Sequence, residues 1–327
     1  MTLLPLSPGE PPLRLGPFRT EAGGLIPDLH VAFRRDGPAL DRAVLVVHAL
    51  TGSADAAGDW WQPLIGSGSA LNVERRQVVG LNLLGSCYGT TGPRELPGFP
   101  ELTPRDLARA QWAALDELGI ERLDLVVGGS LGGMVALEVA LERPAAVERV
   151  MPIAAPARIG NLAAGWNHIQ LQLLSLDPDR GLELARQLAM TTYRSEVDFD
   201  TRDGIGAYLE HQGVKLRHRF HAGSYAALVR AMDRHDIGRE RGGIVTALRS
   251  LATAGVRLTG VGITGDILYG PRQVTALVDA ARAAGVVATY REITSDKGHD
   301  AFLVEWDQLT EILLESLAEE VVIAASA

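Results

Sequence analysis

The sequence lacks features on which several classes of protein depend. Cys87 is the only cysteine among 327 residues, so an internal disulfide is excluded and we expect a reducing, cytoplasmic setting. No run of about 18 apolar residues occurs, which predicts no membrane span, and we expect no signal peptide. The net charge of −9 argues against a nucleic-acid-binding protein, because such proteins usually carry a basic face.

Motifs for bound metals and dinucleotides are missing as well. The sequence contains neither H-E-x-x-H nor paired Cys and His residues at zinc-site spacing, and no G-x-G-x-x-G follows an early strand-like segment. We therefore expect no metal ion and no bound cofactor. The composition, with 46% hydrophobic and 22% charged residues, is ordinary for a globular protein with one large core, or one core plus an insert.

Strand-like and helix-like segments alternate along much of the chain. Six short segments predict strands, and the first three of them predict buried strands: residues 43–48, 77–84, 123–127, 147–154, 256–263 and 286–293. The segment TPRD at 103–106 is a favourable helix start, with a threonine cap, proline first and an acid three residues after the cap. A closing helix is expected at about 306–321. This alternation predicts a mostly parallel sheet with helices on both faces.

The middle of the chain has a different character. Charge-rich helical stretches such as 181–190 and 226–234 follow one another there, without clear strands. We interpret residues 157–251 as a helical insert that lies over the sheet. The expected organisation is therefore a core made of residues 1–156 and 252–327, interrupted by this insert.

The stretch VVGGSLGGM at 126–134 surrounds one serine with glycines. The run before it predicts a strand and the run after it predicts a helix, so Ser130 occupies the turn between them. A tight strand-to-helix turn strains its central residue and brings backbone close, which glycine tolerates. This is the G-x-S-x-G context of a serine nucleophile. The alternative is a glycine-rich turn with an incidental serine.

A serine nucleophile needs a histidine base and an acid that orients the histidine. With this motif the chain order is serine, acid, histidine, and the last two follow late strands. Asp266 follows one late predicted strand, and His299 follows the next with a glycine beside it. We therefore predict Ser130, Asp266 and His299 as a catalytic triad. Asp296 is a rival acid, but it lies in the same loop as His299.

Acyl transfer at a serine also needs N–H donors for the oxyanion that forms. One should be the backbone N–H of Leu131, directly after the nucleophile, and the other should come from the loop after an early strand. The segment HALTG at 48–52 is that loop, and we assign the N–H of Leu50, with its neighbours as alternatives. Cys87 has no histidine beside it, so we predict a packing role for it.

Several longer segments carry a family resemblance. They are HALTGS (48–53), GDWWQPLIGSGSAL (58–71), LNLLGSCYGTTGP (81–93), LTPRDLARAQ (102–111), GGSLGGMVALE (128–138), RFHAGSYAALVRAMDRHD (219–236) and GHDAFLVE (298–305). Their order and content resemble the homoserine O-acyltransferase family over about residues 15–318. The resemblance implies an α/β-hydrolase fold. It also implies transfer of an acetyl group from acetyl-CoA to L-homoserine through an acyl-serine intermediate, in methionine biosynthesis.

The resemblance further implies how the acceptor is held and how the protein assembles. Arg186 matches the family's contact to the substrate carboxylate, Asp300 matches its contact to the ammonium, and Tyr193 would line the same pocket. A planar arginine suits a carboxylate because it can bind it through two hydrogen bonds. A homodimer formed through the lid is implied too. The lid is shorter than usual in the family, because DPDR at 177–180 leads straight into Gly181.

Several alternatives stay open at this point. The donor could be succinyl-CoA, the acceptor could be serine, and the same triad could serve a serine esterase or other hydrolase. A non-catalytic binding protein on the same fold is a further alternative, against which the complete serine, acid and histidine set argues. Four cationic residues of the insert are expected to form a solvated helix face rather than to contact CoA phosphates: Lys215, Arg217, His218 and Arg219.

Overall fold

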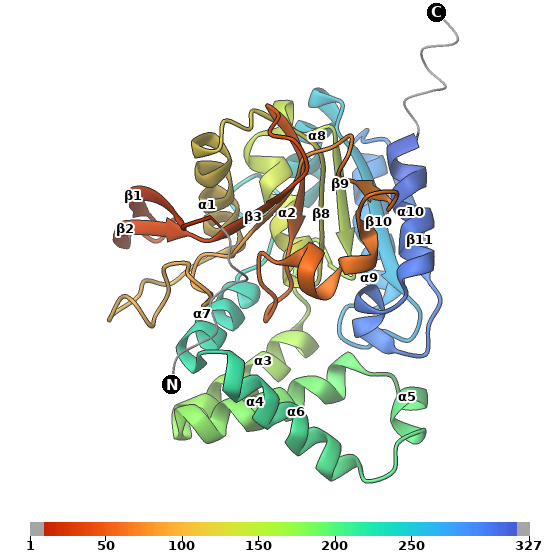
Figure 1. The fold of residues 1–327 in the computed structure, drawn as a ribbon. Coiled ribbons are helices and arrows are strands. Elements are labelled where there is room, and N and C mark those ends of the chain that lie inside the picture. Colours follow the sequence, from red (N-terminus) through yellow and green to blue (C-terminus); the bar gives the residue numbers. More distant parts are fainter. Residues whose placement is uncertain (1–9, 319–327) are drawn as a thin grey trace, which may run out of the picture.

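The computed structural model describes residues 10–318, and a seven-stranded sheet forms its centre (Figure 1). The strands lie in the order β11-β10-β9-β8-β4-β7-β3. They are β3 (Phe33–Asp36), β4 (Arg42–Val47), β7 (Val78–Leu81), β8 (Arg122–Gly129), β9 (Arg149–Ile153), β10 (Arg257–Ile263) and β11 (Ala288–Ile293). All neighbours pair in parallel except β3 with β7. The expected mostly parallel sheet is confirmed.

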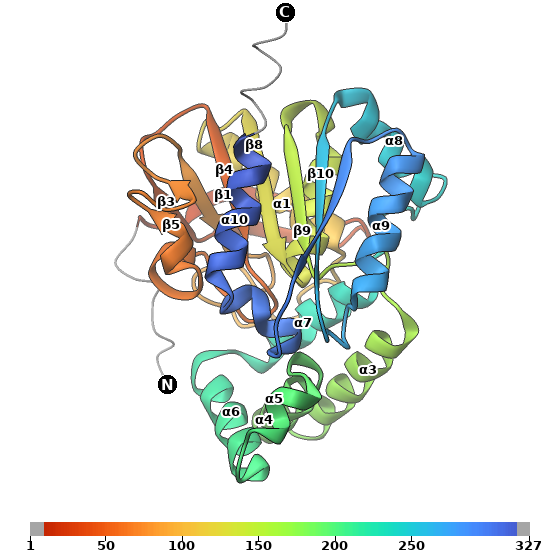
Figure 2. The same cartoon turned by 90° about the vertical axis from the view of Figure 1, so that its right-hand side faces the viewer.

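Helices cover both faces of this sheet, as the alternating pattern predicts. One face carries α1 (Pro104–Glu117), α2 (Leu131–Glu142), α8 (Ile244–Ala254) and α9 (Pro271–Ala283). The other face carries α10 (Trp306–Ala318) and the short turns η1 (Ala56–Trp60) and η2 (Gln62–Leu64). Figure 1 shows α1 and α10 on opposite sides of the strands, and Figure 2 shows α10 in front of them.

Alternate side chains of the central strands enter two separate cores. In β4, Leu45 and Val47 pack on the side of α1 and α2, whereas Val44 and Val46 pack on the side of α10. All four are almost completely buried. Burial on both faces explains why these strands read as continuous apolar runs rather than as alternating ones.

A helical section lies between β9 and β10, beyond the carboxyl ends of the parallel strands (Figure 1). It contains α3 (Asn161–Leu176), α4 (Pro178–Tyr193), α5 (Glu196–Asp200), α6 (Ile205–Arg219) and α7 (Ala222–Asp233). Helix α4 packs against α3 and α6, and α3 packs against α7. Helix α8 differs from them, because it packs on α2 and α9 beside the sheet.

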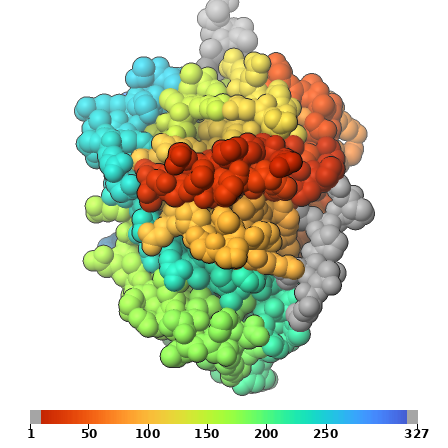
Figure 3. Space-filling view, turned by 90° about the vertical axis from the view of Figure 1, so that its left-hand side faces the viewer, coloured from red at the N-terminus to blue at the C-terminus, as the bar shows by residue number. Residues whose placement is uncertain are grey.

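The N-terminal part contains strands that the sequence patterns did not reveal. β1 (Leu13–Arg19) and β2 (Leu25–Val31) form an antiparallel ribbon, which crosses one side of the molecule in Figure 3. Pro17 and Pro27 lie inside these strands, and the register shifts around Gly16. Proline and glycine interrupt the alternation by which a strand is recognised. The short strands β5 (Ile65–Gly66) and β6 (Leu71–Asn72) complete the set.

The closing helix begins where it was expected. Helix α10 starts at Trp306 and runs to Ala318, and residues 319–321 of the predicted helix lie outside the described part of the chain. The start of α1 also follows its expected signals. The Thr103 side chain accepts a hydrogen bond from the Asp106 N–H, and the Asp106 carboxylate accepts one from the Thr103 N–H. This reciprocal pair satisfies two N–H groups that the helix itself leaves without acceptors.

Candidate active site

Ser130 occupies a one-residue turn between a strand and a helix. β8 ends at Gly129 and α2 begins at Leu131. The serine has φ 57° and ψ −124°, a conformation that a residue with a side chain rarely adopts. Its backbone N–H donates to the carbonyl of Ile153 in the neighbouring strand at 2.9 Å. The packed sheet therefore holds the strained turn in place and leaves the hydroxyl at the carboxyl edge of the strands.

The glycines of the motif are explained by close backbone contacts. A Cβ on Gly132 would lie 2.2 Å from the carbonyl oxygen of Val47, and one on Gly128 would lie 2.6 Å from the backbone of Gly132. A Cβ on Gly129 would lie 2.4 Å from the ring of Phe302. Only glycine fits these approaches without displacing β4 or the ring. The close packing brings the loop after β4 next to the start of α2.

Asp266 and His299 meet behind the nucleophile turn, although 33 positions separate them in the chain. Nδ1 of His299 lies 2.7 Å from one carboxylate oxygen of Asp266. The other carboxylate oxygen accepts the backbone N–H groups of Leu268 at 2.8 Å and Tyr269 at 3.0 Å. Because a carboxylate only accepts, Nδ1 carries the proton of the neutral imidazole. Nε2 of His299 is buried and has no hydrogen-bond partner among the described residues.

The surroundings of His299 raise the pKa of its imidazole. Burial alone lowers this pKa, but the charge and hydrogen bond of Asp266, together with the charge of Asp300, outweigh burial. A nearby carboxylate stabilises the imidazolium that forms when the ring accepts a proton. The arrangement therefore suits a histidine that takes a proton at Nε2 and later returns it.

A cavity of about 550 Å³ opens onto Ser130 and His299. Leu50, from the loop that follows β4, lines the same cavity. Leu131 is the first residue of α2, where backbone N–H groups have no acceptor within the helix. The structure thus brings together the predicted nucleophile, the base and the loop of the predicted oxyanion donor.

The three residues expected to hold the acceptor also line this cavity. The Arg186 guanidinium lies 5.4 Å from the centre of the Tyr193 ring, and the Tyr193 ring lies 5.6 Å from that of His299. Arg186 makes no hydrogen bond or ion pair with another described residue, so its donors are available to a ligand. Asp300 pairs with Arg194 at 3.3 Å. The sequence interpretation missed Arg194, which directly follows Tyr193 at the end of α4.

The expectation of a solvated face for the cationic residues of α6 is wrong for Arg219. Its guanidinium donates to the carbonyl of Thr51 at 2.7 Å, to the Thr51 hydroxyl at 3.2 Å and to the Tyr88 hydroxyl at 3.0 Å. Lys215, one turn earlier, also lines the cavity. Arg217 instead pairs with Glu183 of α4 at 2.7 Å. Helical spacing places Lys215 and Arg219 on one face, but nothing in the sequence indicates what that face meets.

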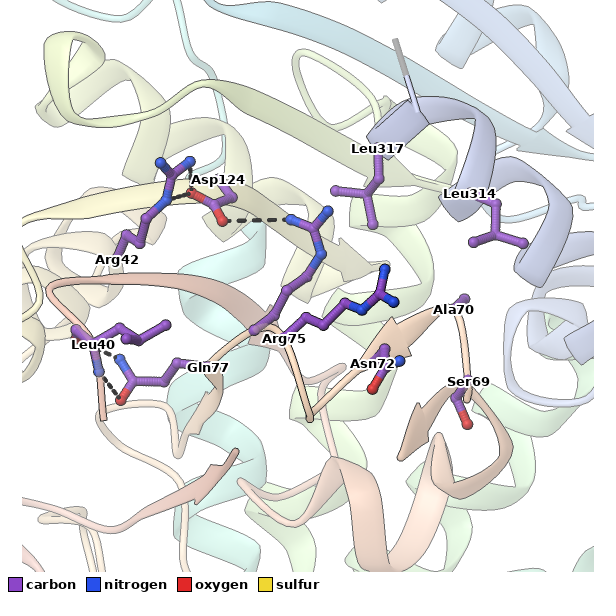
Figure 4. Close-up of a pocket in the computed structure, with 11 residues that line it drawn as sticks. Leu40, Arg42, Ser69, Ala70, Asn72, Arg75, Gln77, Asp124, Leu314 and Leu317 are labelled. Carbon is purple, nitrogen blue, oxygen red and sulfur yellow. Dashed lines mark hydrogen bonds and ion pairs between the residues drawn. The ribbon is translucent and has the colours of Figure 1, made fainter. Parts of the chain in front are cut away.

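Other parts of the described chain do not offer comparable chemistry. Cys87 is 1% exposed, and burial raises the pKa of its thiol to about 11, so it fits a packing role. A cavity of about 510 Å³ surrounds Arg42 and Asp124 (Figure 4). It lies near the amino ends of β4 and β8, away from Ser130, and its lining contains no histidine. Residues 10–318 contain no cluster of metal ligands and no helix long and apolar enough to cross a membrane.

Comparisons with known proteins agree with this arrangement. Residues 42–228 match the family model described as alpha/beta hydrolase fold, and the protein is an enzyme of that fold class. The chain is 45% identical to homoserine O-acetyltransferase of Thermus thermophilus, over 90% of this chain and 88% of the relative. It superimposes on the crystal structure of homoserine O-acetyltransferase from Staphylococcus aureus with a TM-score of 0.83 and 30% identity, over 94% of both chains.

The chain therefore belongs to the homoserine O-acetyltransferase family, and the resemblance carried by its motifs is confirmed. The acetyl esterase MekB is similar in fold as well, with a TM-score of 0.86 over 95% of this chain and 97% of that chain. Its sequence identity is 22%, so this likeness concerns the fold alone.

Proposed function

We propose that the protein transfers an acetyl group from acetyl-CoA to the hydroxyl of L-homoserine, as a step of methionine biosynthesis in the cytoplasm. The observation that carries the proposal is one cavity that combines Ser130 and His299 with a free arginine, Arg186, and a carboxylate, Asp300. The names of the similar proteins support the same reaction. A hydrolase would need the first pair of groups but not the second.

The reaction proceeds in two steps of the ping-pong type. In the first, the Ser130 hydroxyl attacks the thioester carbonyl while Nε2 of His299 accepts its proton. A C–O bond forms, the C–S bond breaks, and CoA leaves as a thiol with the proton from His299. The N–H groups of Leu50 and Leu131 stabilise the negative oxygen of the tetrahedral intermediate. Asp266 remains ionised and keeps the imidazole in the required tautomer.

In the second step the homoserine hydroxyl replaces the serine hydroxyl as nucleophile. His299 accepts the proton of homoserine, the acetyl group moves to the new oxygen, and Ser130 regains its proton. Arg186 binds the substrate carboxylate, and the Tyr193 ring lines the pocket. Asp300 binds the ammonium through the carboxylate oxygen that does not pair with Arg194. Holding the acceptor in this way favours its hydroxyl over water at the acyl-enzyme.

The names of the similar proteins favour acetyl over succinyl as the transferred group, and the contacts of Arg219 occupy one of the two cations of α6 at the cavity, the other being Lys215. A succinyl group carries a carboxylate that requires a partner when it is buried. Arg219 is bound to the loop that follows β4, but its guanidinium already donates to Thr51 and Tyr88. An acetyl group has no second charge and needs no such partner. We therefore propose acetyl-CoA as the donor.

We further propose that the part of residues 157–251 that precedes α8 forms a lid and that the enzyme is a homodimer through it. On α3, Leu162, Ile169 and Leu176 are 64%, 48% and 83% exposed. With Trp166 and Leu173 between them, they follow the alternating spacing of four and three residues that is typical of paired helices. Such an apolar stripe is costly to leave in water, and a second copy of the chain provides a matching stripe.

A substitution on this stripe tests the dimer. Ile169→Asp should convert the protein to monomers in analytical ultracentrifugation, because it places a charge in the paired interface. Leu314→Asp is the matched control, since Leu314 is 49% exposed on α10, outside the insert. A wild-type protein that is monomeric at micromolar concentration would refute the dimer.

The decisive experiment for the reaction follows thiol release from acetyl-CoA and succinyl-CoA, each with and without L-homoserine or L-serine. Intact mass spectrometry of the protein runs in parallel. Homoserine-dependent release from acetyl-CoA, with an acetyl adduct on Ser130, is the expected result. Release that ignores both amino acids would make the protein a hydrolase. Failure of Ser130 to react with any donor, and with a fluorophosphonate probe, would indicate a binding protein.

A further inference from the structure

His48, the first residue of the HALTG loop, is a buried histidine that the reaction scheme does not use. Its side chain is 1% exposed and does not line the active-site cavity. It therefore cannot contact substrate in the observed arrangement. Both of its ring nitrogens nevertheless have partners on the backbone, one on each of two loops at the carboxyl edge of the sheet.

The partners of His48 determine its tautomer. The backbone N–H of Leu83 lies 2.9 Å from Nε2, and an N–H group only donates, so Nε2 must be the acceptor. Nδ1 then carries the proton and donates it to the carbonyl of Ala49 at 2.7 Å. Burial lowers the pKa of His48 to about 4, against the opposing effects of the Ala49 carbonyl and of the Asn82 side chain. The ring therefore stays neutral at physiological pH, as this pair of hydrogen bonds requires.

The bond to Ala49 acts directly on the proposed oxyanion donor. The carbonyl of Ala49 and the N–H of Leu50 belong to one planar peptide group and point in opposite directions. Fixing the carbonyl oxygen on the His48 ring therefore fixes the direction of the Leu50 N–H. A hydrogen bond accepted by the carbonyl also polarises the peptide group and strengthens its N–H as a donor.

Other contacts hold the same turn from the remaining sides. The Ala49 carbonyl accepts a second hydrogen bond from the Gly52 N–H at 3.0 Å, which closes the turn around Leu50. Gly52 packs so closely that a Cβ there would lie 2.9 Å from the Cβ of His48. Arg219 holds the following carbonyl, that of Thr51, from α6. The turn is thus closed by its own backbone and anchored to the core through His48.

We infer that His48 is a positioning residue of the oxyanion site, whose Nδ1–H holds the Ala49–Leu50 peptide so that the Leu50 N–H is directed into the cavity beside Ser130. The inference rests on the proposed function in one respect, since it takes the Leu50 N–H to be an oxyanion donor. It goes beyond the triad because it assigns the preorganisation of that donor to a side chain outside the cavity.

Two substitutions of equal shape separate this role from a structural one. His48→Asn places an amide N–H where Nδ1 lies, whereas His48→Leu places a methyl group there. Neither reaches the Leu83 N–H, so both variants lose that bond equally. The difference between them therefore reports on the bond to Ala49. Thermal melts of both variants measure the structural cost that they share.

The assay is the pre-steady-state release of p-nitrophenol from p-nitrophenyl acetate, which acylates Ser130 without CoA or homoserine. Removal of an oxyanion donor slows an enzyme about 100- to 1000-fold. A donor that is present but misdirected should cause a smaller loss of rate than a donor that is removed. We therefore expect acylation of the Leu variant to be at least about tenfold slower than that of the Asn variant. We expect the KM for homoserine to change little in both variants. Equal acylation rates would overturn the inference.

This assay also separates the inference from the proposed function. Wild-type protein that is acylated by the ester but not by acetyl-CoA would refute the proposed function and leave the comparison of variants intact. A transferase whose two variants are equally fast would refute the role of His48 alone.

A measurement on the wild-type protein covers the case in which a variant fails to fold. Among the eight histidines, His48 and His235 have pKa values lowered to about 4. Nε2 of His235 faces the carbonyl of Pro156 at 2.7 Å, so His235 must carry its proton on Nε2, whereas His48 carries its proton on Nδ1. Nitrogen-15 NMR should show one non-titrating ring of each tautomer above pH 5. Two Nε2–H rings would overturn the inference.

Discussion

The sharpest test of the acceptor site is the removal of the Arg186 charge. Arg186 lines the cavity with Ser130, its guanidinium lies over the Tyr193 ring, and its charge also acts on Tyr225. Replacement by methionine keeps most of the length and apolar stem of the side chain and removes all its donors. The proposed carboxylate contact is lost, while the triad and its hydrogen bonds are left in place.

The expected magnitude follows from the type of contact. A hydrogen bond to a charged group contributes about 1.5–3 kcal/mol, and the loss of one such bond gives a lower limit, because a planar guanidinium can make two to one carboxylate. Since about 1.4 kcal/mol corresponds to a factor of ten, the KM for homoserine should rise roughly 10- to 150-fold. Acylation of Ser130 by acetyl-CoA precedes acceptor binding, so its rate should stay within about twofold of the wild-type rate.

Lys215→Met provides the matched control, because it removes one positive charge from the lining of the same cavity. Homoserine kinetics are measured by CoA release in the steady state, and acylation is measured separately by rapid mixing with acetyl-CoA. A general electrostatic effect would raise the homoserine KM equally in both variants and would refute the assignment. An Arg186→Met enzyme with the wild-type KM would refute it outright.

Further perturbations test three other parts of the structure: the His299–Asp266 pair, the turn at Ser130 and the buried Cys87. Because the pKa of His299 is raised and catalysis needs the neutral ring, kcat/KM should fall as pH drops below a midpoint above about 6.5. Asp266→Asn should slow the reaction and move that midpoint to lower pH, as pH–rate profiles will reveal. Gly132→Ala, whose Cβ would meet a backbone carbonyl of β4 at 2.2 Å, should destabilise the fold by about 2–3 kcal/mol. Denaturant melts of this variant and of the wild-type protein measure the difference. Cys87 should resist a thiol reagent in the native state, and rapid labelling would contradict its burial.

Local patterns carried most of what the sequence revealed about the site. The strand, turn and helix around Ser130 are consecutive in the chain, so the residues that this turn requires all lie within nine positions. The cap of α1 is local in the same sense. The order of Asp266 and His299 along the chain was readable because each follows a segment that predicts a strand. These features need only neighbours in sequence, and propensity and motif arguments work at that range.

Features that depend on distant partners were not readable. Arg219 binds Thr51, and the two are 168 positions apart. Arg194, at the end of α4, pairs with Asp300, which directly follows His299. The residues around a cation on a helix surface do not reveal whether that cation faces solvent or a loop from a distant part of the chain. The two strands at the N-terminus were missed for a similar reason, since their pairing with each other compensates for prolines that weaken the local signal.

The residue types and their order are sufficient for the fold class and for the chemistry that the chain can perform. Apolar periodicity dictates which faces are buried, and the glycines around Ser130 permit only one kind of turn. Three-dimensional packing was needed for every feature that depends on the direction in which a donor or acceptor points. The sequence does not indicate which ring nitrogen of His48 carries the proton. The backbone groups of Leu83 and Ala49, brought to the ring by folding, decide it. Hydrogen bonds depend steeply on distance and angle, so such assignments exist only once distant segments have been brought together.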